Sequence, residues 1–188
     1  MVISFAVITS IEHLTEKYSP VLMRCIPASL MLSHDLRRDR CLFFICRENR
    51  IIVKIEGNRV KRIFTDEASL SGVFRKIKLA LEKKIRKMVI HPGIKIYHTD
   101  ITSFLSKSFT SVIYPSTRGK ELSELSSIEN VMYMLSLDEK TLKNFLADIN
   151  IKKIPIAFPR SMHNSPPDKT IAILNICLDR IMNKLNPY

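Results

Sequence analysis

Residues 129–158, "ENVMYMLSLDEKTLKNFLADINIKKIPIAF", contain two apolar segments on either side of an amphipathic one. Residues 129–137 are apolar on both faces, which is typical of a strand buried inside a sheet. Residues 138–150 begin with acidic side chains and have helical spacing, and residues 152–158 predict a second strand. Because a helix that joins two strands is the usual crossover between parallel neighbours, this stretch predicts an α/β domain with a mostly parallel sheet flanked by helices.

Apolar periodicity elsewhere in the chain predicts more elements of the same two kinds. Strands are expected at residues 3–10, 41–46, 50–57, 93–99 and 111–115, and helices at residues 19–34, 65–90, 100–108 and 168–185. Pro27 is expected to kink or break the helix in which it lies. Since the 188 residues contain no internal repeat or low-complexity segment, the sequence predicts one domain over residues 1–188.

Three polar loops follow the predicted strands of the second half. They are "TRGK" after residue 115, "SLD" after residue 135 and "PRSMHNS" after residue 158. In parallel sheets, ligands bind beyond the carboxyl ends of the strands. The sequence therefore predicts a ligand site where these three loops meet.

The charge balance points to a polyanionic partner. The chain has 30 Lys and Arg against 18 Asp and Glu, a formal net charge of +12. Such an excess is typical of proteins that bind nucleic acid or an anionic membrane surface, although a generally basic proteome would also produce it. Basic residues line one face of the predicted helix at 75–87, as either a solvated face or a surface that follows phosphates. Without aromatic anchors on that helix, nucleic acid is favoured over membrane.

Other classes of protein are excluded or disfavoured by composition. Only four glycines are present, which leaves no P-loop and no dinucleotide-binding fingerprint. The four cysteines form no CxxC pair and the five histidines lack metal-ligand spacing, so buried free thiols and no metal site are expected. No apolar run is long enough to span a membrane, and the amino-terminal segment predicts a strand rather than a signal peptide. A reducing cytoplasm is the expected compartment.

A dense group of charges lies between a predicted helix and a predicted strand, in "ASLMLSHDLRRDRCLFFIC" at residues 28–46. A surface turn needs polarity, but Asn, Gly or Ser would supply it at a lower desolvation cost. Arg37 and Arg38 are adjacent at the end of a buried element. This placement predicts a pair of guanidinium groups that grip an anion.

Several short motifs, taken together, resemble a known family. They are "SHDLRRD" (33–39), "IVKIEGNRVKRI" (52–63), "DEASL" (66–70), "HPGIKIY" (91–97) and "NICLDR" (175–180). In this order they resemble the archaeal tRNA pseudouridine-54 N1-methyltransferases, members of the SPOUT superfamily. The similarity runs from about residue 20 to residue 181, which is nearly the whole chain.

The resemblance implies a SPOUT-type α/β domain with a C-terminal trefoil knot that works as a homodimer. It also implies that S-adenosylmethionine is used to methylate N1 of a pseudouridine in the T-loop of tRNA. The residues that it implies are Asp66 and Arg38 for catalysis, Arg37, Arg38 and Arg40 for RNA phosphate, and Leu135, Ser136, Phe158 and Thr170 for the cofactor. Asp66 has two interpretations: a helix N-cap, or a group that hydrogen-bonds the uracil edge or accepts its proton.

The sequence departs from the family at the predicted cofactor loops. Ser136, Leu137 and Asp138 stand where the family has a Gly-Asp-His type turn, and Thr170 stands at a family cysteine. The loop "FPRSMHNSPP" (158–167) lacks the family glycine. Because a side chain can obstruct a backbone contact that glycine permits, an alternative stays open. In that alternative the chain is a catalytically inactive knotted protein that binds RNA or a partner protein.

Overall fold

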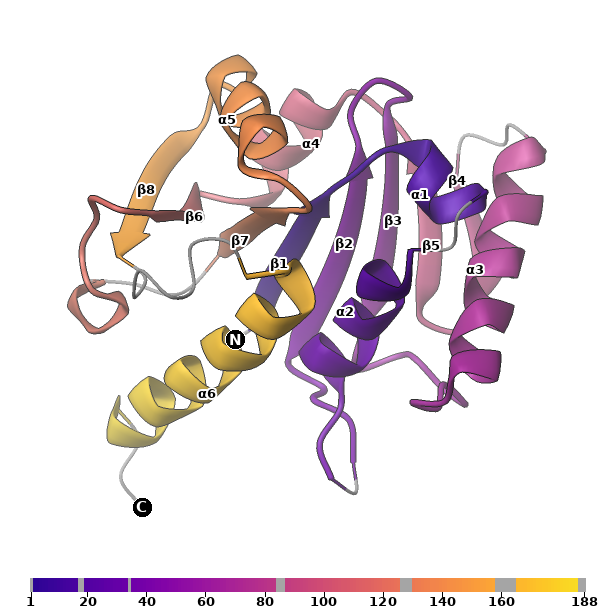
Figure 1. Ribbon diagram of the computed structural model, residues 1–188, viewed down its shortest axis with the longest axis horizontal. Helices are drawn as coiled ribbons and strands as arrows, with labels where there is room; N and C mark the ends of the chain where they lie inside the picture. The colour runs from indigo at the N-terminus through magenta and orange to yellow at the C-terminus, as the bar shows by residue number, and fades with distance from the viewer. Residues whose placement is uncertain are drawn as a thin grey trace.

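The computed structural model describes residues 2–16, 19–33, 35–83, 87–125, 130–157 and 165–185. Its centre is one eight-stranded sheet with the order β4-β5-β3-β2-β1-β7-β6-β8 (Figure 1). The strands are β1 (Ile3–Ile8), β2 (Arg40–Cys46), β3 (Ile51–Glu56), β4 (Lys87–His91), β5 (Ile94–His98), β6 (Ser111–Ser116), β7 (Val131–Ser136) and β8 (Lys152–Ala157). The helices are α1 (Ile11–Thr15), α2 (Pro20–Leu30), α3 (Glu67–Glu82), α4 (Ile101–Ser108), α5 (Glu139–Asp148) and α6 (Pro167–Leu185), with a 3₁₀ turn, η1, at Leu122–Glu124.

The sheet has a parallel block and an antiparallel edge. Strands β2, β1, β7, β6 and β8 are parallel neighbours, whereas β3, β5 and β4 continue the sheet in antiparallel pairs. The helix between β7 and β8 makes the crossover that residues 129–158 predict. The expectation of a mostly parallel α/β sheet flanked by helices is confirmed.

Two layers of helices cover the sheet. Helices α1, α2, α3 and α6 contribute to the larger hydrophobic core, while α4 and α5 pack on the opposite face (Figure 1). The apolar stripe of α3 is buried as its spacing predicts, and the rings of Phe74 and Phe44 lie 5.9 Å apart. None of the described helices is long and apolar enough to cross a bilayer.

The prediction of one helix from residue 65 to 90 is wrong at its end. Helix α3 ends at Glu82, and residues 87–91 form β4, a hairpin partner of β5. Gly93 (φ 80°) makes the turn between these two strands, a left-handed conformation that favours glycine. The basic face predicted at 75–87 is therefore divided between two elements, and Lys84, Ile85 and Arg86 lie outside the described residues.

Helix α2 continues through Pro27 to Leu30, so the break that the sequence allowed for does not occur. Pro27 lies in the last turn, where few helical hydrogen bonds remain to be lost. Its own carbonyl still accepts the Met31 N–H at 3.0 Å. The short helix α1 after the first strand was not predicted, since five residues give too little periodicity.

The segment after β6 wraps around the edge strand β8. Strand β6 pairs with one edge of β8, and Lys120 bonds the other edge, donating to the Pro155 carbonyl at 3.3 Å and accepting the Ala157 N–H at 2.8 Å. Gly119 makes this possible, because a Cβ there would lie 2.7 Å from backbone atoms of Pro155. Strand β8 therefore runs between β6 and the loop that follows β6.

Candidate functional site

A cleft of about 460 Å³ opens beyond the carboxyl ends of β6 and β7. We call it the β7 cleft; its walls include Thr117, Leu135, Ser136, Leu142, Pro167 and Thr170. These residues come from the loop after β6, the end of β7, helix α5 and the start of α6. Two of the three loops that the sequence predicts to meet, those after β6 and β7, thus border one cleft, and its use as a ligand site stays a prediction.

The floor of the β7 cleft is held by a capped helix. Asp138 is the N-cap of α5 and accepts hydrogen bonds from the Thr141 N–H and hydroxyl, both at 2.7 Å. The Ser136 hydroxyl donates to the Asp138 carbonyl. The Thr141 side chain and N–H hold the pKa of the Asp138 carboxyl below its ordinary value. Asp138 therefore stays ionised and fixes the turn between β7 and α5.

Three of the four residues predicted for the cofactor come together in this cleft: Leu135, Ser136 and Thr170. The Thr170 hydroxyl donates to the Pro166 carbonyl at 3.3 Å, an internal bond of the first turn of α6. Phe158, the fourth, lies outside the described residues. Neither Ser136 nor Thr170 closes the cleft, although both are larger than the glycine or cysteine that the resemblance implies.

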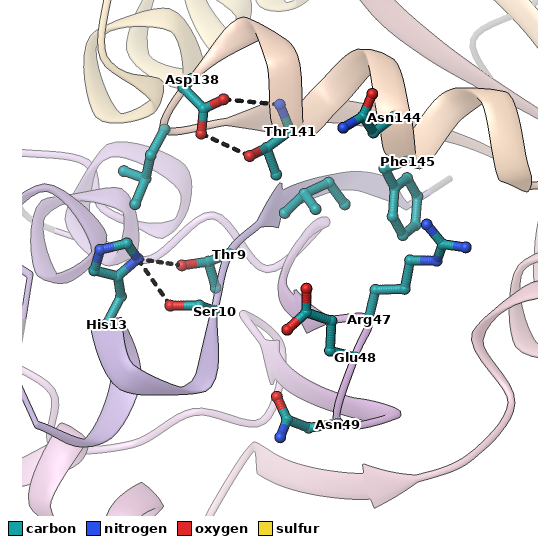
Figure 2. Close-up of a pocket in the computed structure, with 12 residues that line it drawn as sticks. Thr9, Ser10, His13, Arg47, Glu48, Asn49, Asp138, Thr141, Asn144 and Phe145 are labelled. Atoms are coloured by element: carbon teal, nitrogen blue, oxygen red, sulfur yellow. Dashed lines mark hydrogen bonds between the residues drawn. The ribbon is translucent and has the colours of Figure 1, made fainter.

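A second hollow, of about 480 Å³, adjoins the β7 cleft (Figure 2). We call it the β1 cavity; it is lined by the end of β1, the β2–β3 turn and α5, and its polar members are Thr9, Ser10, His13, Arg47, Glu48, Asn49, Asp138, Thr141 and Asn144. Both hollows share Leu137 and Asp138. The chain leaves β1 through α1 and α2 on one face and leaves β7 through α5 on the other, and such reversals of strand order are where α/β sheets bind ligands. Sequence alone missed this cavity because the strand order was unknown.

Two polar side chains of the β1 cavity have partners within the described residues, and a third does not. The Nδ1 atom of His13 lies 3.2 Å from the Ser10 hydroxyl and 3.4 Å from that of Thr9. Arg47 pairs with Asp148. The exposed Glu48 carboxylate makes no ion pair or hydrogen bond within the described part of the chain, and Figure 2 shows it turned toward the cavity.

The charge cluster at residues 35–40 does not line either hollow. Arg40 has a fully buried side chain that donates from Nε to Asn175 at 2.8 Å, binds Asp179 at 2.7 Å and pairs with Asp39. Arg37 also binds Asp179, at 2.7 Å. Burial lowers the pKa of the Arg40 guanidinium, while the two carboxylates oppose that change. These arginines fasten α6 to the start of β2, so the predicted contact of Arg40 with RNA has no exposed surface on which to form.

Arg38 has the opposite environment. Its side chain is 71% exposed, and its nearest carboxylate, Asp35, is 3.9 Å away. An exposed and loosely paired guanidinium remains available to a phosphate. Of the three arginines predicted to bind RNA, Arg38 is the one that the structure leaves accessible, and its role there stays a prediction.

Asp66 is the N-cap of α3 and accepts the Ser69 N–H at 2.8 Å, which confirms the simpler of its two interpretations. The start of α3, which Asp66 caps, lies at the end of the sheet where β2 begins, away from the carboxyl end of β7 (Figure 1). Within one subunit neither Asp66 nor Arg38 lines the β7 cleft or the β1 cavity. Any contact of theirs with a reacting base there would need a second subunit.

Comparisons with known proteins agree with this geometry. The family model described as "Putative SAM-dependent RNA methyltransferase" matches residues 16–181. The chain belongs to this RNA methyltransferase family. A tRNA (pseudouridine(54)-N(1))-methyltransferase of Methanococcus maripaludis (strain C6) is 28% identical over 176 residues, which cover 86% of this chain and 84% of that relative.

A second relative matches a shorter part of the chain. The enzyme of the same name from Methanocorpusculum labreanum is 31% identical over 94 residues, 46% of this chain and 48% of its own length. Among solved structures, Archaeoglobus fulgidus Nep1 bound to S-adenosylhomocysteine has a TM-score of 0.62 at 12% identity, covering 97% of this chain and 99% of that one. The structural likeness shows a shared fold.

Proposed function

We propose that the chain transfers a methyl group from S-adenosylmethionine to N1 of pseudouridine 54 in tRNA. The observation that carries the proposal is an open cleft at the carboxyl ends of the parallel strands in a chain that belongs to an RNA methyltransferase family. Side chains that filled this cleft would have favoured the inactive alternative. We further propose that the chain acts in the cytoplasm as one domain.

The residues of the β7 cleft fit S-adenosylmethionine. Leu135, Leu142 and Leu146 provide apolar walls for an adenine ring, and the Thr117 and Ser136 hydroxyls provide polar contacts for the rest of the molecule. The volume of about 460 Å³ is in the range of cofactor sites. When bound, the cofactor supplies an electrophilic methyl group. The chain must then hold the acceptor base beside it and assist the loss of the N1 proton.

We assign the β1 cavity as the binding site of the target base. It shares Leu137 and Asp138 with the β7 cleft, so its occupant would adjoin the cofactor. Amide groups of Asn49 and Asn144 can both donate to and accept from the alternating polar groups of a uracil edge. Glu48 is the carboxylate of this cavity that no described partner neutralises, and it could accept the N1 proton.

We also propose a C-terminal trefoil knot and a homodimer. The wrapping of residues 116–120 around β8 supports the knot, because it places β8 between β6 and the loop that follows β6. The absence of Asp66 and Arg38 from the linings of the β7 cleft and the β1 cavity supports the dimer, since a partner subunit could bring them to a cleft. In this arrangement Arg38 holds an RNA phosphate and Asp66 contacts the base across the subunit interface.

The decisive experiment compares two tRNA transcripts that differ only at position 54. We expect radiolabelled methyl transfer to tRNA with pseudouridine at this position and none to tRNA with uridine. The reason is chemical: N1 of pseudouridine carries a proton, whereas N1 of uridine is bonded to ribose. Binding of both transcripts without any transfer would contradict the proposal and favour the inactive RNA-binding protein.

A mixed-dimer experiment tests the roles of Asp66 and the cleft together. Asp66→Asn keeps the helix cap but removes the charge, and Ser136→Trp fills the cleft; we expect each variant alone to be inactive. If Asp66 acts on the partner's cleft, an equal mixture should regain about a quarter of the wild-type sites, because each mixed dimer has one intact site. Absence of recovery would show that Asp66 does not act across subunits, and Glu48 would then be the carboxylate to replace.

A further inference from the structure

A third pocket, of about 320 Å³, lies away from both hollows and shares no lining residue with either of them. We call it the β3 pocket. It is formed near the amino ends of β1 and β2, beside the end of β3, and its lining includes Arg38, Lys54, Glu56, Asn58, Tyr97 and Phe104. It lies on the sheet face that carries α4, opposite α2 and α3.

Aromatic side chains make one wall of the β3 pocket. The rings of Phe43 and Phe104 are 6.1 Å apart, Phe104 and Tyr97 are also 6.1 Å apart, and Phe109 meets Phe43 edge-on at 6.0 Å. Phe43 is buried, but Tyr97, Phe104 and Phe109 are partly exposed. A partly exposed aromatic surface is what an unstacked nucleobase needs to replace the stacking that it loses.

Lys54 lies against that wall, and Glu56 holds it together with Lys95. Lys54 lies 5.7 Å from the centre of the Phe43 ring and 2.9 Å from one Glu56 oxygen, while Lys95 lies 2.7 Å from the other. Burial raises the pKa of Glu56, but both lysines outweigh it and hold the pKa below its ordinary value. Glu56 therefore stays ionised and holds the two ammonium groups over the sheet.

The rim of the pocket adds an exposed cation and side-chain amides. Arg38 is largely exposed, with Asp35 as its loose partner. Counting Arg38, Lys54 and Lys95 against Glu56 and Asp35, the surroundings remain positive. Asn58 and Asn130 add side-chain amides that can pair with the edge of a base. Single-strand recognition uses stacking, phosphate neutralisation and contacts to base edges. The β3 pocket offers all three.

We infer that the β3 pocket binds one unstacked nucleotide of an RNA strand, outside the methyl-transfer site. Its volume fits a single base with its sugar rather than a cofactor, and its charge complements the adjoining phosphate. Within one subunit the pocket would anchor the RNA at a distance from the β7 cleft and the β1 cavity. This inference goes beyond the proposed methyl transfer, because it concerns binding alone and holds for an inactive protein as well.

Binding of tRNA to the full chain without S-adenosylmethionine, measured by fluorescence anisotropy, tests the inference. We expect Phe104→Leu to weaken binding about tenfold through lost stacking. Arg38→Gln should reduce the slope of log affinity against log salt by about one, the loss of one phosphate contact. Phe64→Leu and Arg180→Gln are the matched controls, because both side chains are exposed and line none of the three pockets; they should bind as the wild type does.

Photo-crosslinking adds a readout of where the RNA lies on the protein. With tRNA that contains 4-thiouridine, crosslinks to the peptide spanning residues 97–109 are expected in the wild type and should be lost in Lys54→Gln. Unchanged affinity in Phe104→Leu with no crosslink to this peptide would overturn the inference, whether or not the protein methylates tRNA. Melting curves of each variant establish that it is folded.

Discussion

Ser136→Trp should reduce the affinity for S-adenosylmethionine by at least about a hundredfold and abolish methyl transfer. Ser136 ends β7 and lines the β7 cleft, so an indole at this position would occupy the space proposed for the cofactor. The fold should survive because the added volume enters an existing hollow instead of the packed core. Calorimetric titration of the cofactor into wild type and variant measures the effect directly.

The control for this experiment is Ser106→Trp on α4, where an exposed serine outside all three pockets is enlarged in the same way. This variant should bind S-adenosylmethionine normally. If Ser136→Trp bound the cofactor as tightly as the wild type, the cofactor site would have to lie outside the β7 cleft. The proposed function could then still hold, since transfer to tRNA is measured separately.

Arg40→Met should destabilise the protein by about 3–5 kcal/mol, the usual cost of removing one partner from a buried ion pair. The Arg40 side chain is 0% exposed, and its loss would leave the Asn175 amide oxygen and part of the Asp179 carboxylate without their donors. For a chain of this length, the melting temperature should fall by roughly 6–20 °C. Circular dichroism on heating measures the fall.

Arg38→Met is the matched control, two residues away in the same cluster. Its guanidinium is largely exposed and 3.9 Å from Asp35, so the change in stability should stay within about 0.5 kcal/mol. Equal effects of the two replacements would contradict the assignment of Arg40 to the anchor of α6. The pair also separates roles, because weaker RNA binding without lower stability is expected for Arg38 and not for Arg40.

A glycine explains why the arginine cluster and the "IEG" motif occur together. A Cβ at Gly57 would lie 2.1 Å from the Arg37 carbonyl oxygen, and the Gly57 N–H donates to the Arg40 carbonyl at 2.9 Å. The backbone of residues 37–40 therefore rests on the end of β3. Two motifs that carried the family resemblance are parts of one packed corner.

Local features were predictable from the sequence because their energies depend on near neighbours. The acidic starts of α3, α4 and α5 are N-caps, with Asp66, Asp100 and Asp138 each accepting the N–H three residues later. Buried strands such as β7 and the crossover helix after it follow from apolar spacing alone. The wrong prediction of a helix at residues 87–91 has the same origin. A short apolar run is compatible with a helix or a strand, and only its pairing partner, here β5, decides between them.

The candidate site was only partly predictable. Leu135, Ser136 and Thr170 were predicted from the family resemblance, and the fold brings them together in the β7 cleft. The β1 cavity and the β3 pocket could not be predicted, because each joins side chains from elements distant in sequence. Phe43 and Phe104, for example, belong to a strand and a helix that meet only in the folded sheet.

The sequence by itself determined the α/β alternation, the helix starts, the basic character and the family. Only the tertiary structure decided the roles of the adjacent arginines, since Arg40 meets Asp179 across 139 positions of sequence whereas Arg38 meets solvent. The physical reason is that the energy of a charge depends on burial and on partners. Both are properties of the packed chain. Identical side chains two residues apart can therefore have different roles, one as a buried anchor and the other as an exposed cation.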